Sequence, residues 1–140
     1  MYQLSTLGHN DAQRAIQAIQ AEALKRGKAI TVAVGDARGE LIGLLRLDGA
    51  LLPSVTVATN KVFTAARENK TTQQIGQAVR DPKNGFDIAY FGDSRFIGWS
   101  GGLPVIINGA TVGAVAVSGV TPEEDAELAQ IGVTAITAGK

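Results

Sequence analysis

LPVIINGATVGAVAVS, residues 103–118, contains the clearest folding signal in the sequence. Its Asn108-Gly109 dipeptide separates two apolar runs and favours a two-residue hairpin turn, because both residues tolerate a positive φ angle. The second run, residues 112–117, is apolar without alternation, which predicts a strand covered on both faces. This stretch therefore predicts a β-hairpin whose second strand lies at the centre of a sheet.

A second hairpin is predicted upstream, from two apolar, β-rich runs at residues 29–34 and 41–47. The sequence between them, GDARGE at residues 35–40, is short and contains Asp and Gly, as hairpin loops do. Two hairpins in one small chain indicate an antiparallel sheet.

Helices are predicted around these hairpins. Apolar residues recur at helical spacing over residues 10–26 and 53–69. The segment TPEE at residues 121–124 combines a threonine cap, a first-turn proline and a glutamate three residues after the cap, which predicts the start of a last helix. A short helix is expected to end at Val79, and residues 80–102 are predicted to form an irregular loop of functional or interfacial importance.

This order of elements predicts one α/β domain over residues 1–140, with an antiparallel sheet covered by helices. Hydrophobic residues make up 45% of the chain and charged residues 19%, which is typical of a globular domain. The formal net charge is zero, so we expect neither a nucleic-acid partner nor a membrane partner.

The residue inventory narrows the chemistry. The chain has no cysteine, which excludes disulfides, thiolate metal sites and a cysteine nucleophile. Its single histidine makes a zinc site unexpected. The first residues do not form a secretory signal, and no apolar stretch approaches the roughly 20 residues of a membrane-spanning helix. We therefore expect a cytoplasmic protein without a metal site.

Two polar residues and one glycine pair each have a structural interpretation and a chemical one. His9 precedes a helix, where it is either a solvated residue or an axial haem ligand or general base. Ser118 ends a strand without a Gly-x-Ser-x-Gly motif around it, which favours a serine that caps backbone groups over a nucleophile. Gly101-Gly102 precedes a strand, which favours a turn over a backbone anion nest.

Charged residues offer further candidates. Asp36 and Arg46 lie at the ends of the first predicted hairpin, and Lys61 lies beside the apolar stripe of the second helix. Such a lysine either extends to solvent or points into a cleft and binds an anion. The loop FGDSRFIGW, residues 91–99, places Asp93 and Arg95 among aromatic residues and the only tryptophan, as in ligand clamps and subunit interfaces. The candidate ligand-binding residues are Asp36, Arg46, Lys61, Arg95, Trp99 and Ser118.

Several segments resemble GlcG/HbpS-like proteins in the order in which they occur. VGDARGEL at residues 34–41, with RLDGA at 46–50, resembles the first hairpin of that family. Lys61 with TAA at residues 64–66 resembles its second helix. The second hairpin and the acidic segment after it resemble the family through GGLPV at residues 101–105, VGAVAVSG at 112–119 and TPEED at 121–125.

The resemblance implies a profilin-like α/β sandwich and a homo-oligomer of even subunit number. It also implies a haem-binding protein, since members of this family are commonly described so, including the C-terminal domain of some corrinoid adenosyltransferases. Other members belong to catabolic settings such as glycolate utilisation. The residues that could supply an axial ligand to haem in this chain are His9, Tyr2, Tyr90 and Met1.

Three functions are compatible with these observations. The first is small-ligand binding, with haem as the named candidate and His9 as its ligand. The second is a cofactor-independent isomerase or lyase acting on an organic acid, in which Lys61 and Arg95 hold the carboxylate and Asp36 or Asp93 moves a proton. The third is an accessory subunit that docks a partner through the loop around Trp99. The first two expect these charged side chains to surround one cavity.

Overall fold

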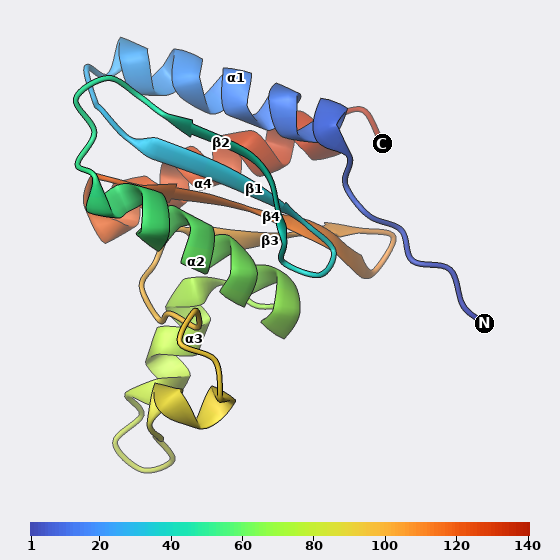
Figure 1. Cartoon of the computed structure of the whole chain (residues 1–140), viewed down its shortest axis with the longest axis vertical. Helices are drawn as coiled ribbons and strands as arrows, with labels where there is room; N and C mark the ends of the chain where they lie inside the picture. The colour runs from blue at the N-terminus through green and yellow to red at the C-terminus, as the bar shows by residue number, and fades with distance from the viewer.

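A four-stranded antiparallel sheet forms the middle layer of the computed structural model, which describes all 140 residues (Figure 1). The strand order is β2-β1-β4-β3, so β4 lies inside the sheet and pairs with both β1 and β3. The expected central position of the second strand of the Asn-Gly hairpin is confirmed. The strands are β1 (Thr31–Asp36), β2 (Leu41–Arg46), β3 (Gly102–Ile107) and β4 (Ala110–Ser118).

The hairpin turn between β3 and β4 has the conformation that its residues favour. Asn108 has a φ of 52° and Gly109 a φ of 78°, and two positive φ angles are what a tight two-residue hairpin turn requires. Pro104 lies in β3, an edge strand, where its missing N–H interrupts no central ladder.

Helices cover both faces of this sheet, as the sequence predicts (Figure 1). α1 and α4 pack together on one face, and α2 packs on the other. α3 and the short 3-10 helix η1 lie beside each other past α2, and α3 meets the sheet only at its start, where Thr72 Oγ1 accepts from the Gly102 N–H of β3 at 2.9 Å. The bounds are α1 (His9–Lys25), α2 (Pro53–Glu68), α3 (Thr72–Val79), η1 (Ile88–Phe91) and α4 (Pro122–Thr137).

Side-chain size, rather than polarity, alternates along β4. Val115 and Val117 face α1 and α4, whereas Ala114 and Ala116 face α2. Small side chains under α2 let its backbone come close to the sheet. A Cβ atom at Gly102 would lie only 2.8 Å from the main-chain oxygen of Lys61. The start of β3 therefore packs closely against the middle of α2, and this contact fixes the position of Lys61.

The helix ends differ from the prediction in detail. α1 begins at His9, and the Asp11 carboxylate reaches back to accept a hydrogen bond from the Gly8 N–H at 2.9 Å. At the start of α4, the Thr121 hydroxyl caps the helix by accepting from the Glu124 N–H at 3.2 Å, as expected. The Glu124 carboxylate pairs with Arg26 at 3.2 Å.

None of the helices is long and apolar enough to cross a lipid bilayer.

Candidate functional site

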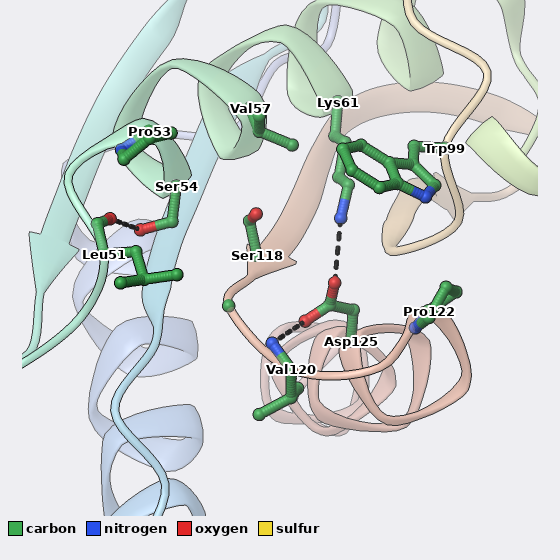
Figure 2. A pocket seen from close by; sticks show the side chains of 11 residues that line it. Leu51, Pro53, Ser54, Val57, Lys61, Trp99, Ser118, Val120, Pro122 and Asp125 are labelled. Carbon is green, nitrogen blue, oxygen red and sulfur yellow. Dashed lines mark hydrogen bonds and ion pairs between the residues drawn. The ribbon is translucent and has the colours of Figure 1, made fainter.

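A pocket of about 240 Å³ opens where β4 ends, between the first half of α2 and the start of α4 (Figure 2). We call it the Lys61 pocket. Its surface is mostly apolar, and a few polar groups converge on it. The residues that bring polar atoms or shape its mouth are Leu51, Ser54, Lys61, Trp99, Ser118 and Asp125.

A buried ion pair lies in this pocket. Lys61 Nζ, from α2, donates to Asp125 Oδ2 of α4 at 3.0 Å and to the main-chain oxygen of Val117 at 2.9 Å. The side chains of Lys61 and Asp125 are only 1% and 6% exposed. The second carboxylate oxygen of Asp125 accepts from the Val120 N–H at 3.1 Å, which fixes the direction of the first. The pair therefore joins α2, β4 and α4 at one point (Figure 2).

Burial moves the two pKa values toward each other. Loss of hydration lowers the pKa of the Lys61 ammonium, and the nearby Asp125 charge opposes this shift. Loss of hydration likewise raises the pKa of the Asp125 carboxyl, and Lys61 opposes that shift. Both shifts favour the neutral forms, so proton exchange within this pair requires less free energy than in an exposed lysine–aspartate pair.

Two glycines make room for the lysine. Gly101 has a φ of +125°, and a Cβ atom there would lie 2.7 Å from Lys61 Nζ and 2.9 Å from Asp125 Cβ. Gly102 likewise packs against the main chain of Lys61. The Gly101-Gly102 pair is thus more than a turn, because a side chain at Gly101 would collide with the ion pair and one at Gly102 with the main chain of Lys61.

Two serine hydroxyls complete the polar lining. Ser54 Oγ forms a hydrogen bond with the buried Thr31 Oγ1 at 2.7 Å, so this hydroxyl already has a partner within the chain. Ser118 is 7% exposed, and its side chain points toward α2 (Figure 2). The Ser118 hydroxyl makes no hydrogen bond within the chain, which leaves it free to bind a ligand.

The structure brings together only part of the predicted set. Lys61, Trp99 and Ser118 line the pocket, whereas Asp36 and Arg46 do not. Asp36 Oδ1 accepts from the main-chain N–H groups at positions 38 and 40, so it builds the β1–β2 loop. Arg46 is exposed at the end of the edge strand β2.

Asp93 and Arg95 form a separate cluster by the second half of α2. Their side chains pair at 2.9 Å, and the Arg95 guanidinium lies 3.9 Å from the centre of the Phe63 ring. This arrangement raises the pKa of Arg95 and lowers that of Asp93 to about 2. The two charges are therefore satisfied by each other, away from Lys61. The expected cavity shared by Asp36, Lys61, Arg95 and Ser118 is not what the chain forms.

His9 lies at the opposite end of the sheet from the Lys61 pocket. It is exposed at the first position of α1. The nearby Leu7 N–H bonds to the main-chain oxygen of Val112, near the start of β4, whereas the pocket lies by Ser118, where β4 ends. No group of three His, Cys, Asp or Glu side chains gathers where it could hold a metal ion.

Sequence reasoning missed Asp125, although a signal was present. Asp125 shares its helical face with the buried residues Leu128, Ala129 and Gly132, at spacings of three, four and seven. An acidic residue on an apolar stripe needs a buried partner, because a lone buried charge is very unfavourable. Lys61, which lies on the apolar stripe of α2, is the matching signal.

Comparison with known sequences places these features in a family. The family model described as "Haem degrading protein HbpS-like" matches residues 7–134. A 15.0 kDa protein of the dhaT-dhaS intergenic region of Citrobacter freundii is 34% identical over 91% of this chain and 90% of its own length. Protein GlcG of Escherichia coli K12 is 31% identical over 80% of this chain and 81% of its own length.

Solved structures share the fold. The Klebsiella pneumoniae protein ORFY is 31% identical, with a TM-score of 0.93 over 99% of this chain and 95% of that chain. A double mutant of Streptomyces reticuli HbpS is 28% identical, with a TM-score of 0.85 over 96% of this chain and 89% of that one. PduOC in complex with heme is 23% identical, with a TM-score of 0.87 over 94% and 96%, a likeness of fold alone. The chain therefore belongs to the HbpS-like family, as its ordered motifs predict.

Proposed function

We propose that this protein binds a small organic molecule in the Lys61 pocket. The observation that carries the proposal is a buried charged pair and a free hydroxyl, converging on a mostly apolar hollow. An apolar cavity with a few placed polar groups is the usual form of a small-molecule site. Lys61 uses two of its three N–H donors within the chain, which leaves one for a ligand oxygen.

The size of the pocket limits the ligand. Its 240 Å³ lies below the roughly 300–1,000 Å³ that encloses drug-sized molecules. At ~30 Å³ per water-sized group, it accommodates about eight non-hydrogen atoms. The pocket therefore suits a short carboxylic acid, aldehyde, ketone or alcohol with an apolar remainder.

Haem does not fit this pocket. The family description and the PduOC heme complex make haem the natural candidate. A porphyrin is larger than the pocket, and none of the pocket residues is a His, Met, Tyr or Cys that could ligate iron. The candidate ligands His9, Tyr2, Tyr90 and Met1 are all exposed outside the pocket. The Lys61 pocket therefore suits a small organic molecule rather than haem.

The fluorescence of Trp99 tests small-ligand binding, because this is the only tryptophan and lies at the pocket mouth. Titration with short acids, aldehydes and ketones should produce a saturable change for at least one class. Ser118→Ala should weaken that binding, because the hydroxyl is lost, whereas Ser94→Ala, on the exposed loop, should leave it unchanged. Absence of saturable binding across all these classes contradicts the proposal.

A haem titration separates the two ligands. If haem binds through His9, its Soret band should weaken in His9→Ala, and the small ligands should still change Trp99 fluorescence. A Soret band that disappears in Ser118→Ala and persists in His9→Ala would instead mean that haem does bind in the Lys61 pocket.

The enzymatic alternative has one observation in its favour. Lys61 has a carboxylate within hydrogen-bonding distance, as proton-transfer catalysis requires, and that carboxylate belongs to Asp125. Asp36 and Asp93, the acids that the sequence suggested for this role, bind a loop N–H group and Arg95 instead. An isomerase or lyase acting at this site would lose turnover in Asp125→Asn and keep it in Asp93→Asn.

An even-numbered homo-oligomer is a further part of the proposal. Leu51, Leu52 and Trp99, at or next to the pocket mouth, are 72%, 68% and 58% exposed. A cluster of exposed large apolar residues is typical of an interaction surface. Light scattering should give an even subunit number, which should fall in Leu52→Asp; a monomer at micromolar concentration contradicts the proposal. A cytoplasmic location stays a prediction from the sequence.

A further inference from the structure

We propose that Lys61 is a covalent carbonyl-binding site, whose Nζ condenses with a small aldehyde or ketone in the pocket to form a protonated Schiff base. The inference rests on the proposed function, since the carbonyl compound must first enter the Lys61 pocket.

The position of Lys61 favours an amine nucleophile. Lys61 is 1% exposed, yet it lines a pocket that opens to solvent. A lysine on a surface-facing helix normally extends its ammonium to water. This one is held at the pocket by Asp125 and Val117, and Gly101 and Gly102 supply the space that it occupies. The chain therefore presents an amine to the pocket interior rather than to bulk water.

The carboxylate of Asp125 accompanies this amine as a proton acceptor. Nζ and Oδ2 of Asp125 are 3.0 Å apart, so a proton moved along this hydrogen bond gives a neutral amine and a carboxylic acid. Both products are favoured by burial, which already lowers the pKa of Lys61 and raises that of Asp125. A desolvated lysine with a nearby proton acceptor is the usual form of an activated amine nucleophile.

Lys61 and Asp125 together supply every proton transfer that Schiff-base formation needs. Asp125 takes one proton from the Lys61 ammonium, and the nitrogen lone pair forms a bond to the carbonyl carbon while the C=O π electrons move onto oxygen. A second proton passes from nitrogen to that oxygen, which gives a neutral carbinolamine. The acid form of Asp125 then protonates the carbinolamine hydroxyl, which leaves as water while the nitrogen lone pair forms the C=N bond. The products are one protonated Schiff base, one water and the original Asp125 carboxylate.

The lining favours a small carbonyl compound over a larger one. The free Ser118 hydroxyl can donate to the carbonyl oxygen, and the apolar wall around Val57 accommodates a short alkyl chain. Butanal, with a four-carbon chain, fits within the space for about eight non-hydrogen atoms.

Reductive trapping tests the proposal on the wild-type protein. The chain is incubated near pH 7 with butanal and cyanoborohydride, and butylated lysines are located by peptide mass mapping. Lys61 should react faster than Lys70 and Lys83, because a lowered lysine pKa leaves more of the free amine at this pH. Both control lysines are exposed and react without entering a pocket. Labelling of Lys70 and Lys83 while Lys61 stays unmodified overturns the proposal.

A narrowed pocket separates reaction in the folded state from reaction after local unfolding. Val57→Phe adds bulk to the wall and leaves the ion pair in place. It should reduce labelling of Lys61 at least tenfold without changing Lys83. Unchanged labelling of Lys61 would mean that the amine reacts outside the pocket, which also overturns the proposal.

The trapping result also distinguishes this inference from the proposed function. If butanal gives a saturable Trp99 signal and no adduct at Lys61, the pocket binds carbonyl compounds without bonding to them, and only the covalent step fails. If neither butanal nor any other small ligand changes Trp99 fluorescence and no adduct forms, the proposed function fails as well.

Discussion

Replacing Lys61 by methionine should destabilise the protein strongly at neutral pH and much less at acidic pH. Methionine fills much of the same volume, so the main change is the loss of the ammonium. Asp125, whose side chain is 6% exposed, then keeps only its bond from the Val120 N–H. Removing one partner of a buried ion pair typically costs about 3–5 kcal/mol, because the remaining charge has no counterpart.

The pH dependence follows from the proton that Asp125 can bind. A carboxyl with the ordinary pKa of 3.8 can be protonated at pH 7.5 at a cost of about 5 kcal/mol, which sets an upper limit on the loss. At pH 5.5 the same limit is about 2 kcal/mol. Without Lys61, burial raises the Asp125 pKa further. The folded variant therefore binds this proton more tightly than the unfolded chain, and its stability is lost as pH rises through the raised pKa.

Urea unfolding followed by circular dichroism measures this effect. With a slope of about 2 kcal/mol per molar urea, a loss of about 4 kcal/mol lowers the midpoint by about 2 M at pH 7.5. Lys28→Met is the matched control: Lys28 is 47% exposed and 3.9 Å from Glu124, so its loss should be below about 0.5 kcal/mol. The double variant Lys61→Met with Asp125→Leu should recover most of the lost stability. A loss below about 1 kcal/mol at pH 7.5 for the single variant, or an equal loss at both pH values, would mean that Asp125 is not left as an unpaired buried charge.

Three further predictions concern the surroundings of the pocket. Gly101→Ala should destabilise the fold more than Gly109→Ala, because Gly109 also has a positive φ but no atom lies within 4 Å of the added Cβ; equal midpoints in urea would contradict this. Carbon-detected NMR should show the Asp93 carboxyl titrating near pH 2, and its pKa should rise toward 3.8 in Arg95→Gln. In the wild-type protein this lowered pKa contributes stability that is present above about pH 4 and is lost as pH falls through 2. Asp36→Ala should lower the free energy of unfolding by about 1–3 kcal/mol, because two loop N–H groups lose their acceptor. The ligand-dependent fluorescence of Trp99 should not change, and a changed ligand affinity would mean that Asp36 takes part in binding.

The hairpins and helix starts were predictable because their determinants are local. Asn108-Gly109 contains the turn within two residues, and the Thr121 cap needs only the N–H three residues away. The layer order was also accessible, since an uninterrupted apolar strand has to be covered on both faces. These features depend on neighbours in the chain, which periodicity and turn chemistry describe.

The site was only partly predictable, because its central contact joins residues far apart in the chain. Lys61 and Asp125 are separated by 64 positions, and only the packing of α2 and α4 at the end of β4 brings them together. Arg95 and Asp93 were candidates because they are charges near aromatic residues. They lie only two residues apart, however, and they form an ion pair with each other. A charge on an apolar helical face, such as Asp125, is the better indicator, because it requires a buried partner.

The most direct test of a small-ligand site at the Lys61 pocket is an NMR titration of the 15N-labelled protein with the tightest-binding short acid or carbonyl compound. If the ligand binds there, the indole N–H of Trp99 and the main-chain N–H groups of Gly119 and Val120 should shift most, with saturation at one ligand per chain. Shifts concentrated around His9 at the other end of the sheet, or spread evenly over the surface without saturation, would contradict binding at the Lys61 pocket.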